Sequence, residues 1–182
     1  MTDLVYIDEY GLKGSNFYWR KHAAHGLTKE DIIGVGVTSD RVQIDKTLVE
    51  PLLAINKELE HRGWELYIKE GYRSKELYEI VYKRRIEKYG EKETAGIFNM
   101  TKMPHASGRA VDIAIWDKET NKEIYLRDSK DGAPALFLNF YKGKDDVESK
   151  KYQELQEFLV KIMQSCGFHL GTKNEYFHFE LD

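Results

Sequence analysis

A chain of 182 residues is long enough to bury a hydrophobic core, and its single cysteine excludes an intramolecular disulfide. The formal net charge of −3 shows no basic excess, so we expect no surface that follows nucleic-acid phosphates. The N-terminal residues lack the basic and apolar regions of a signal peptide, and no stretch approaches membrane-spanning length. We therefore expect a cytoplasmic protein without a membrane partner, or one released by a route other than a signal peptide.

The chain shows no sign of division into separate parts. No internal repeat, low-complexity tract or Pro/Ser-rich linker interrupts it, so residues 1–182 are predicted to form one domain. Residues 1–42 are rich in Gly, Tyr and Asp, and we interpret them as an irregular segment with short strands that wraps the rest. Cys166 follows a run with helical apolar spacing and is interpreted as a small core residue.

The next part of the chain combines helical and strand patterns. Apolar residues at helical spacing predict an amphipathic helix over 46–62, which Gly63 ends. Residues 64–69 alternate between apolar and polar as in a strand. Ser74 is a suitable N-cap for a second helix, which Gly90 ends.

The second half contains further strands and a third helix. Residues 111–115 are apolar at every second position, so one face of this strand is core and the other carries Asp112. A turn at 117–121 leads to a hairpin partner at 124–126. The remaining elements are a helix with its apolar stripe from Tyr152 to Ile162, its end at Gly167, and a last strand near 177–181. Helices and hairpins without regular alternation predict an α+β fold with a central antiparallel sheet and helices packed around it.

Two segments of this framework carry histidines and carboxylates. His105 precedes a glycine, Gly108, which lets the backbone turn so that a loop histidine can face the strand of Asp112. The last strand supplies His178. Catalytic zinc takes imidazole and carboxylate ligands and keeps one position for water. The sequence therefore predicts one zinc ion per chain, bound by His105, Asp112 and His178 in a cleft on the sheet.

Glu175 is the carboxylate left over for a general base. Its separation from His178 is odd, so strict strand alternation would put the two on opposite faces of the sheet. They converge only if Glu175 lies in the turn before the strand, which the sequence 171–174 makes plausible. The alternative is a solvated turn carboxylate with no catalytic role.

Arg73 and the other histidines are further candidates. Arg73 stands where a strand ends and a helix begins, and its guanidinium could stabilise an oxyanion; the alternative is a surface salt bridge to Glu70. His22 and His25 are interpreted as loop residues, and His61 as the end of a helix. His169 is interpreted either as a surface residue or as a residue that orients a metal ligand.

With these residues identified, the chain resembles the D-alanyl-D-alanine dipeptidases and carboxypeptidases, which are zinc peptidases acting on peptidoglycan peptides. The family signature Ser-x-His-x-x-Gly-x-Ala-x-Asp matches at His105, Gly108, Ala110 and Asp112, the motif Glu-x-x-His matches at Glu175 and His178, and Gly-Tyr-Arg matches at Gly71, Tyr72 and Arg73. The resemblance covers residues 64–182. It implies that His105, Asp112 and His178 bind zinc, that Glu175 is the base, and that Arg73 stabilises the tetrahedral intermediate.

The resemblance is strongest to the dipeptidase branch, with two departures. Met103 replaces the first serine of the signature, and Pro104 precedes the histidine, so hydroxyls that can hold a substrate carboxylate are missing. The Phe-Asp element that often binds the substrate amine is also absent after the hairpin.

From these patterns we predict hydrolysis of the dipeptide D-Ala-D-Ala or a related peptidoglycan-derived peptide. The alternatives are a D,D-carboxypeptidase or an L-alanyl-D-glutamate endopeptidase with the same site. A further alternative is not an enzyme but a domain that binds zinc or a cell-wall peptide without hydrolysing it. The sequence leaves the oligomeric state open.

Overall fold

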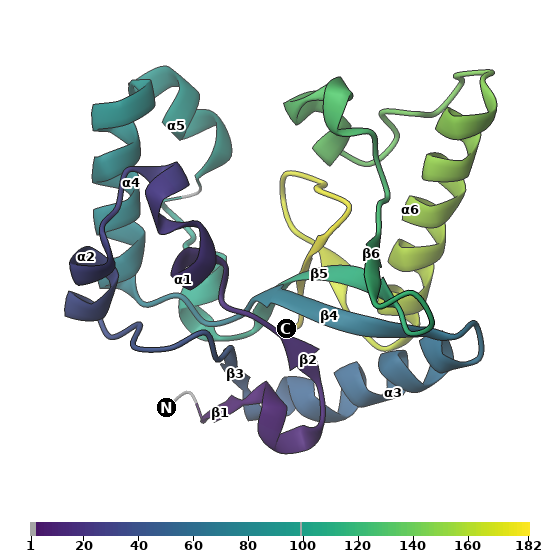
Figure 1. Cartoon of the computed structure of the whole chain (residues 1–182), viewed down its shortest axis with the longest axis horizontal. Coiled ribbons are helices and arrows are strands. Elements are labelled where there is room, and N and C mark those ends of the chain that lie inside the picture. Colours follow the sequence, from purple (N-terminus) through teal and green to yellow (C-terminus); the bar gives the residue numbers. More distant parts are fainter. Residues whose placement is uncertain (1–2, 99) are drawn as a thin grey trace. The chain divides into compact units, whose positions relative to one another are not determined.

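The computed structural model describes residues 3–98 and 100–182. It confirms the predicted α+β class, with helices and strands mixed along the chain (Figure 1). The helices are α1 Phe17–Lys21, α2 Lys29–Gly34, α3 Val49–Glu60, α4 Lys75–Tyr89, α5 Glu91–Ile97 and α6 Val147–Ser165. The strands are β1 Leu4–Tyr6, β2 Lys13–Gly14, β3 Gln43–Asp45, β4 Trp64–Glu70, β5 Ala110–Asp117, β6 Lys122–Ile124, β7 His169–Leu170 and β8 His178–Glu180.

The strands form two sheets. The larger sheet has the order β2-β4-β5-β8-β7, and β6 also pairs with β5. The pairs β5–β6 and β7–β8 are antiparallel, with Ile115 opposite Ile124 and Leu170 opposite Phe179. The smaller sheet pairs β1 with β3. The predicted hairpin after the strand of Asp112 is therefore confirmed.

Two compact units can be distinguished along the chain. The first consists of Met1–Lys46 and Ile68–Val111, and the second of Thr47–Tyr67 and Asp112–Asp182. Strands β4 and β5 each contribute residues to both units. The prediction of a single domain stays a prediction.

The first unit contains short helices that the sequence did not indicate. A buried cluster joins α1, α2 and α4 through Tyr18, Leu27, Ile32, Leu77 and Val81. Residues 1–42 were expected to be irregular with short strands; the strands are present, but the irregular character was wrong, because the segment also contains α1 and α2. Side chains cap both short helices, because Asn16 accepts from the N–H of Trp19 and Thr28 forms a capping box with Asp31. Residues 1–2 of this segment lie outside the described residues.

The second unit is built on α3 and α6, which pack against each other. The helix predicted over 46–62 is confirmed as α3, preceded by a 3₁₀ turn at Lys46–Leu48. Its buried residues recur at helical spacing: Val49, Leu52, Ile55 and Leu59. The interpretation of Cys166 as a core residue was wrong, because it follows the last turn of α6 and is partly exposed.

The second predicted helix is also confirmed. Helix α4 begins after Ser74, whose hydroxyl accepts from the N–H of Leu77 at 3.1 Å, and Gly90 follows its last residue. No helix within residues 3–98 and 100–182 combines the length and the apolar character that crossing a membrane requires. The location in the cytoplasm stays a prediction.

Candidate metal centre

His105 lies in a short 3₁₀ turn, Pro104–Ser107, that precedes β5. Two residues in the left-handed region bracket this turn, Met103 at φ 42° and Gly108 at φ 75°. Glycine adopts this conformation without a Cβ clash, as the sequence predicted for the residue that turns the chain. His105 is 3% exposed, and its backbone N–H donates to the hydroxyl of Tyr78 at 3.1 Å. The histidine is therefore fixed in a buried position.

A backbone carbonyl orients the imidazole of His105. Its Nδ1 lies 2.8 Å from the carbonyl oxygen of Gly71. Because a carbonyl oxygen can only accept, Nδ1 carries a proton, and in the neutral form of the ring Nε2 is the nitrogen with the lone pair. Gly71 approaches β3 so closely that a Cβ would overlap the carbonyl of Gln43 and lie 2.8 Å from Cγ2 of Ile44. The glycine of the Gly-Tyr-Arg motif thus holds the carbonyl that orients His105.

Asp112 and His178 come from the adjacent strands β5 and β8. The backbone N–H of Ile113 donates to the carbonyl of Phe177 at 3.0 Å, which joins the two chain segments beside these residues. Oδ1 of Asp112 lies 2.7 Å from Nδ1 of His178. Oε1 of Glu180 lies 3.3 Å from Nε2 of the same ring. A carboxylate therefore faces each nitrogen of this imidazole.

These carboxylates control the protonation of His178. Burial by itself lowers the pKa of a histidine because it disfavours the charged ring. Hydrogen bonds to Asp112 and Glu180, together with the charge of Glu175, outweigh burial and raise the pKa of His178 to about 10. Without a metal, the ring is therefore an imidazolium at neutral pH, and a bound cation would take the place of a proton.

His105, Asp112 and His178 form a group that could hold a metal ion. One ligand atom from each of them lies within 4.8 Å of the others. The donor set fits zinc, which takes imidazole nitrogen and carboxylate oxygen at about 2.0–2.2 Å and in catalytic sites has three protein ligands. The contacts of the two imidazoles fit as well, because a histidine that binds a metal through one nitrogen usually donates a hydrogen bond from the other nitrogen to a carbonyl or a carboxylate. In the part of the chain that the structure describes, no second group of this kind is present.

Glu175 lies before β8 as an isolated bridge residue, with turns at 172–173 and 176–177 on either side. Its backbone forms an isolated antiparallel bridge with Phe137, and its carbonyl accepts from the N–H of His178 at 3.2 Å. The neighbouring N–H of Leu138 donates to the carbonyl of Asn174 at 2.8 Å. The segment around Phe137 therefore fixes the turn, and the charge of Glu175 is close enough to contribute to the raised pKa of His178.

Arg73 is paired with Glu70, as the alternative interpretation proposed, but the pair is buried rather than on the surface. Nε and Nη2 of Arg73 donate to the two carboxylate oxygens at 2.7 and 2.6 Å. The guanidinium carbon lies 4.9 Å from the ring centroid of Tyr18 and 4.3 Å from that of Tyr78. Burial opposes the charge of Arg73, but Glu70 holds its pKa well above the ordinary value. The backbone N–H of Arg73 also donates to the carbonyl of His105 at 3.1 Å.

The other histidines have different surroundings. His22 and His25 lie in a 3₁₀ turn rather than a loop, and Nδ1 of His25 lies 2.9 Å from Nη1 of Arg85. Burial, with the charge of Arg85, lowers the pKa of His25 to about 4. His169 is half exposed and lies 3.2 Å from a carboxylate oxygen of Asp182, which agrees with the surface interpretation.

Two residues of the site were not identified from the sequence. Glu180 faces His178, and a signal was available, because residues two apart in a strand share a face. Gly171 pairs with His178 through a backbone hydrogen bond of 3.2 Å. No pattern in the sequence identified this close approach.

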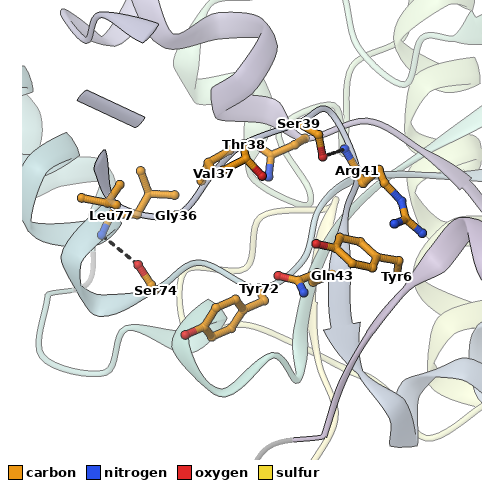
Figure 2. A pocket seen from close by; sticks show the side chains of 12 residues that line it. Tyr6, Gly36, Val37, Thr38, Ser39, Arg41, Gln43, Tyr72, Ser74 and Leu77 are labelled. Atoms are coloured by element: carbon orange, nitrogen blue, oxygen red, sulfur yellow. Dashed lines mark hydrogen bonds between the residues drawn. The ribbon is translucent and has the colours of Figure 1, made fainter. Parts of the chain in front are cut away.

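A small polar pocket lies in the first unit (Figure 2). Its volume of about 50 Å³ has room for a few water molecules but not for a peptide. Its lining includes Tyr72 and Ser74, which flank Arg73 in the chain, as well as Arg41. Arg41 binds the carboxylates of Asp8 and Glu9, so its charge is already balanced. None of the predicted site residues lines this pocket.

Comparison with known proteins finds likeness in structure but not in sequence. No protein family and no curated protein matches the chain. Among solved structures, the chain is similar to the LdcB LD-carboxypeptidase, whose structure is described as revealing the molecular basis of peptidoglycan recognition. The TM-score is 0.50 and the identity 15%, over 76% of this chain and 59% of that one. The chain thus spans less than two thirds of LdcB, and the likeness concerns the fold.

Two further structures show weaker likeness. One is a mutant of the vancomycin resistance D,D-pentapeptidase VanY in complex with Zn(II), with a TM-score of 0.44 and 15% identity over 76% of this chain and 72% of that one. The other is VanYB in complex with D-alanine-D-alanine, with a TM-score of 0.44 and 14% identity over 76% of this chain and 71% of that one.

Proposed function

We propose that this protein is a zinc peptidase that hydrolyses D-Ala-D-Ala or a closely related peptide derived from peptidoglycan. The group formed by His105, Asp112 and His178 carries the proposal. Three protein ligands of these types are the pattern of a catalytic zinc rather than a structural one, which usually has four. The fold likeness to LdcB, which is described as recognising peptidoglycan, supports a substrate of that origin.

The residues of the chain have separate roles in this mechanism. Nε2 of His105, a carboxylate oxygen of Asp112 and Nδ1 of His178 would hold the ion. When bound, zinc polarises a carbonyl and lowers the pKa of water to about 7. Glu175 accepts the proton of the attacking water and passes it to the amine that leaves. The turn fixed by Phe137 holds Glu175 in place for this transfer.

Arg73 would stabilise the negative charge that develops on the substrate carbonyl oxygen. Nε and Nη2 already bind Glu70, so Nη1 is the nitrogen that remains for the substrate. The buried pair and the surrounding rings fix the plane of the guanidinium before the substrate arrives. A donor that does not reorganise during the reaction contributes most to such stabilisation.

The choice of dipeptide rests on the resemblance to the dipeptidase branch. We expect the purified protein to contain one zinc ion per chain and to release D-alanine from D-Ala-D-Ala in a zinc-dependent reaction. Hydrolysis of muropeptides alone would favour the D,D-carboxypeptidase or the L-alanyl-D-glutamate endopeptidase. Zinc binding with no turnover of D-Ala-D-Ala, muropeptides or purified cell walls would leave only the non-catalytic alternative.

A further inference from the structure

We propose that Glu180 and Gly171 are positioning residues that hold the imidazole of His178 with Nδ1 directed to the metal; this inference rests on the proposed zinc site. The contacts of the ring carry it. His178 and Glu180 are two residues apart on β8 and point to the same face. Oε1 of Glu180 lies 3.3 Å from Nε2, the nitrogen that does not face Asp112.

The position of the proton gives Glu180 its role. A neutral imidazole carries one proton, and only the nitrogen without it can bind a metal. Nδ1 of His178 lies 2.7 Å from Asp112, a contact that by itself would draw the proton to Nδ1 and block metal binding. Nε2–H donates a hydrogen bond to the carboxylate of Glu180, which keeps the proton on Nε2 and leaves the lone pair of Nδ1 for the ion. An acidic acceptor behind a histidine ligand also increases the basicity of that ligand.

Gly171 lies against the same ring, beside its Cδ2 and Nε2 atoms. Its backbone N–H donates to the carbonyl of His178 at 3.2 Å, so the two residues are paired where β7 ends. A Cβ at position 171 would overlap Cδ2 of His178, lie 2.8 Å from Nε2 and lie 3.0 Å from Oε1 of Glu180. Any side chain at this position must therefore displace the ring or the carboxylate that holds it.

The two histidine ligands are thus held in the same manner by different groups. For His105 the acceptor is the carbonyl of Gly71, and for His178 it is the carboxylate of Glu180. In each case a glycine provides a close approach that no other residue allows, Gly71 against β3 and Gly171 against the ring. Glu180 is not a member of the group that could bind the ion. Its role is therefore to orient a ligand.

The experiment measures zinc affinity directly by competition with a chromophoric chelator. We expect Glu180→Ala to bind zinc about 10–100-fold more weakly than the wild type, the usual effect of losing an outer partner of a ligand. Glu180→Gln keeps an acceptor oxygen without the charge and should bind with an affinity between the two. Gly171→Ala should also weaken binding, because its Cβ displaces the ring.

Matched controls separate this effect from a loss of folding. Glu154→Gln removes an exposed carboxylate on α6, and Gly34→Ala adds a methyl group where no atom lies within 4 Å; both should bind zinc as the wild type does. Circular dichroism of the chelator-treated variants monitors folding. If Glu180→Ala or Gly171→Ala does not fold, the milder variant Glu180→Gln is loaded with Co²⁺ instead. The absorption spectrum of its Co²⁺ form reports the geometry of the ligands.

The outcomes distinguish this inference from the proposed function. A wild type that binds zinc, with folded Glu180→Ala and Gly171→Ala variants of unchanged affinity, overturns the positioning role and leaves the zinc site intact. A wild type that binds no zinc removes the site itself. Weaker binding in both variants with unchanged controls supports the role of Glu180 and Gly171.

Discussion

Oδ1 of Asp112 and Nδ1 of His178 lie 2.7 Å apart on adjacent strands. This distance is shorter than the separation of two ligand atoms that are bound to the same metal ion. In the loaded protein, both atoms would bind the ion at about 2.0–2.2 Å, so the contact between them would open slightly. The strands therefore bring the two ligands together before the metal arrives, and binding replaces a proton rather than rearranging the chain.

The first prediction concerns Asp112. Asp112→Asn keeps the size of the side chain but removes the negative charge that a zinc site uses, and a neutral amide is a weak ligand for this ion. We expect zinc affinity to fall by more than the roughly 10–100-fold that follows the loss of a residue hydrogen-bonded to a metal ligand. Metal analysis of the purified variant, after dialysis against a chelator and then zinc, measures this loss. Full zinc occupancy in Asp112→Asn would show that the carboxylate is not a ligand.

The second prediction concerns Glu175. Glu175→Ala removes the proposed proton carrier while leaving all three ligands, so kcat should fall by about 10²–10⁴. Zinc content should remain that of the wild type. Steady-state rates and metal analysis on the same preparation test both statements. A nearly normal rate would exclude the general-base role and would make Glu175 a turn residue.

The third prediction concerns Arg73. Removing it leaves the carboxylate of Glu70 buried and unpaired, which costs about 3–5 kcal/mol in the free energy of unfolding. The same change should lower kcat by about 10²–10³ if Nη1 contacts the oxyanion. Denaturant unfolding of Arg73→Ala measures the first effect, and rates at a temperature where the variant is folded measure the second.

A double variant separates the two roles of Arg73. Replacing both members of the buried pair, as in Glu70→Leu with Arg73→Met, removes the unpaired charge and should recover much of the lost stability. The rate should not recover with it. Recovery of both would assign the pair to folding alone.

Part of this site could be predicted from the sequence, because local rules decide it. The odd separation of Glu175 and His178 requires a break in strand alternation, and the turn at 176–177 interrupts the chain between them. The partner of Arg73 could also be named, since Glu70 is three residues away. The burial of that pair could not be predicted, because the covering ring of Tyr18 comes from α1, a helix distant in the chain.

The N-terminal helices escaped prediction for a related reason. Helix α1 spans only Phe17–Lys21, which is too short to show a periodic apolar pattern or to be stable in isolation. Its packing against α4 through Tyr18 and Leu77 supplies the missing stability. The cap residue Asn16 was a usable signal, but side-chain caps also occur in turns.

The last prediction concerns acid stability and His25. Burial and the neighbouring Arg85 lower the pKa of His25 to about 4, whereas an unfolded histidine titrates near its ordinary value of 6.5. Between these values the unfolded chain binds a proton that the folded protein does not, so stability contributed by neutral His25 is present above pH 6.5 and is lost as the pH falls to about 4. His25→Gln should remove this part of the pH dependence. Denaturant unfolding of the wild type and His25→Gln at several pH values in this range measures the difference, and parallel curves for the two proteins would contradict the assignment.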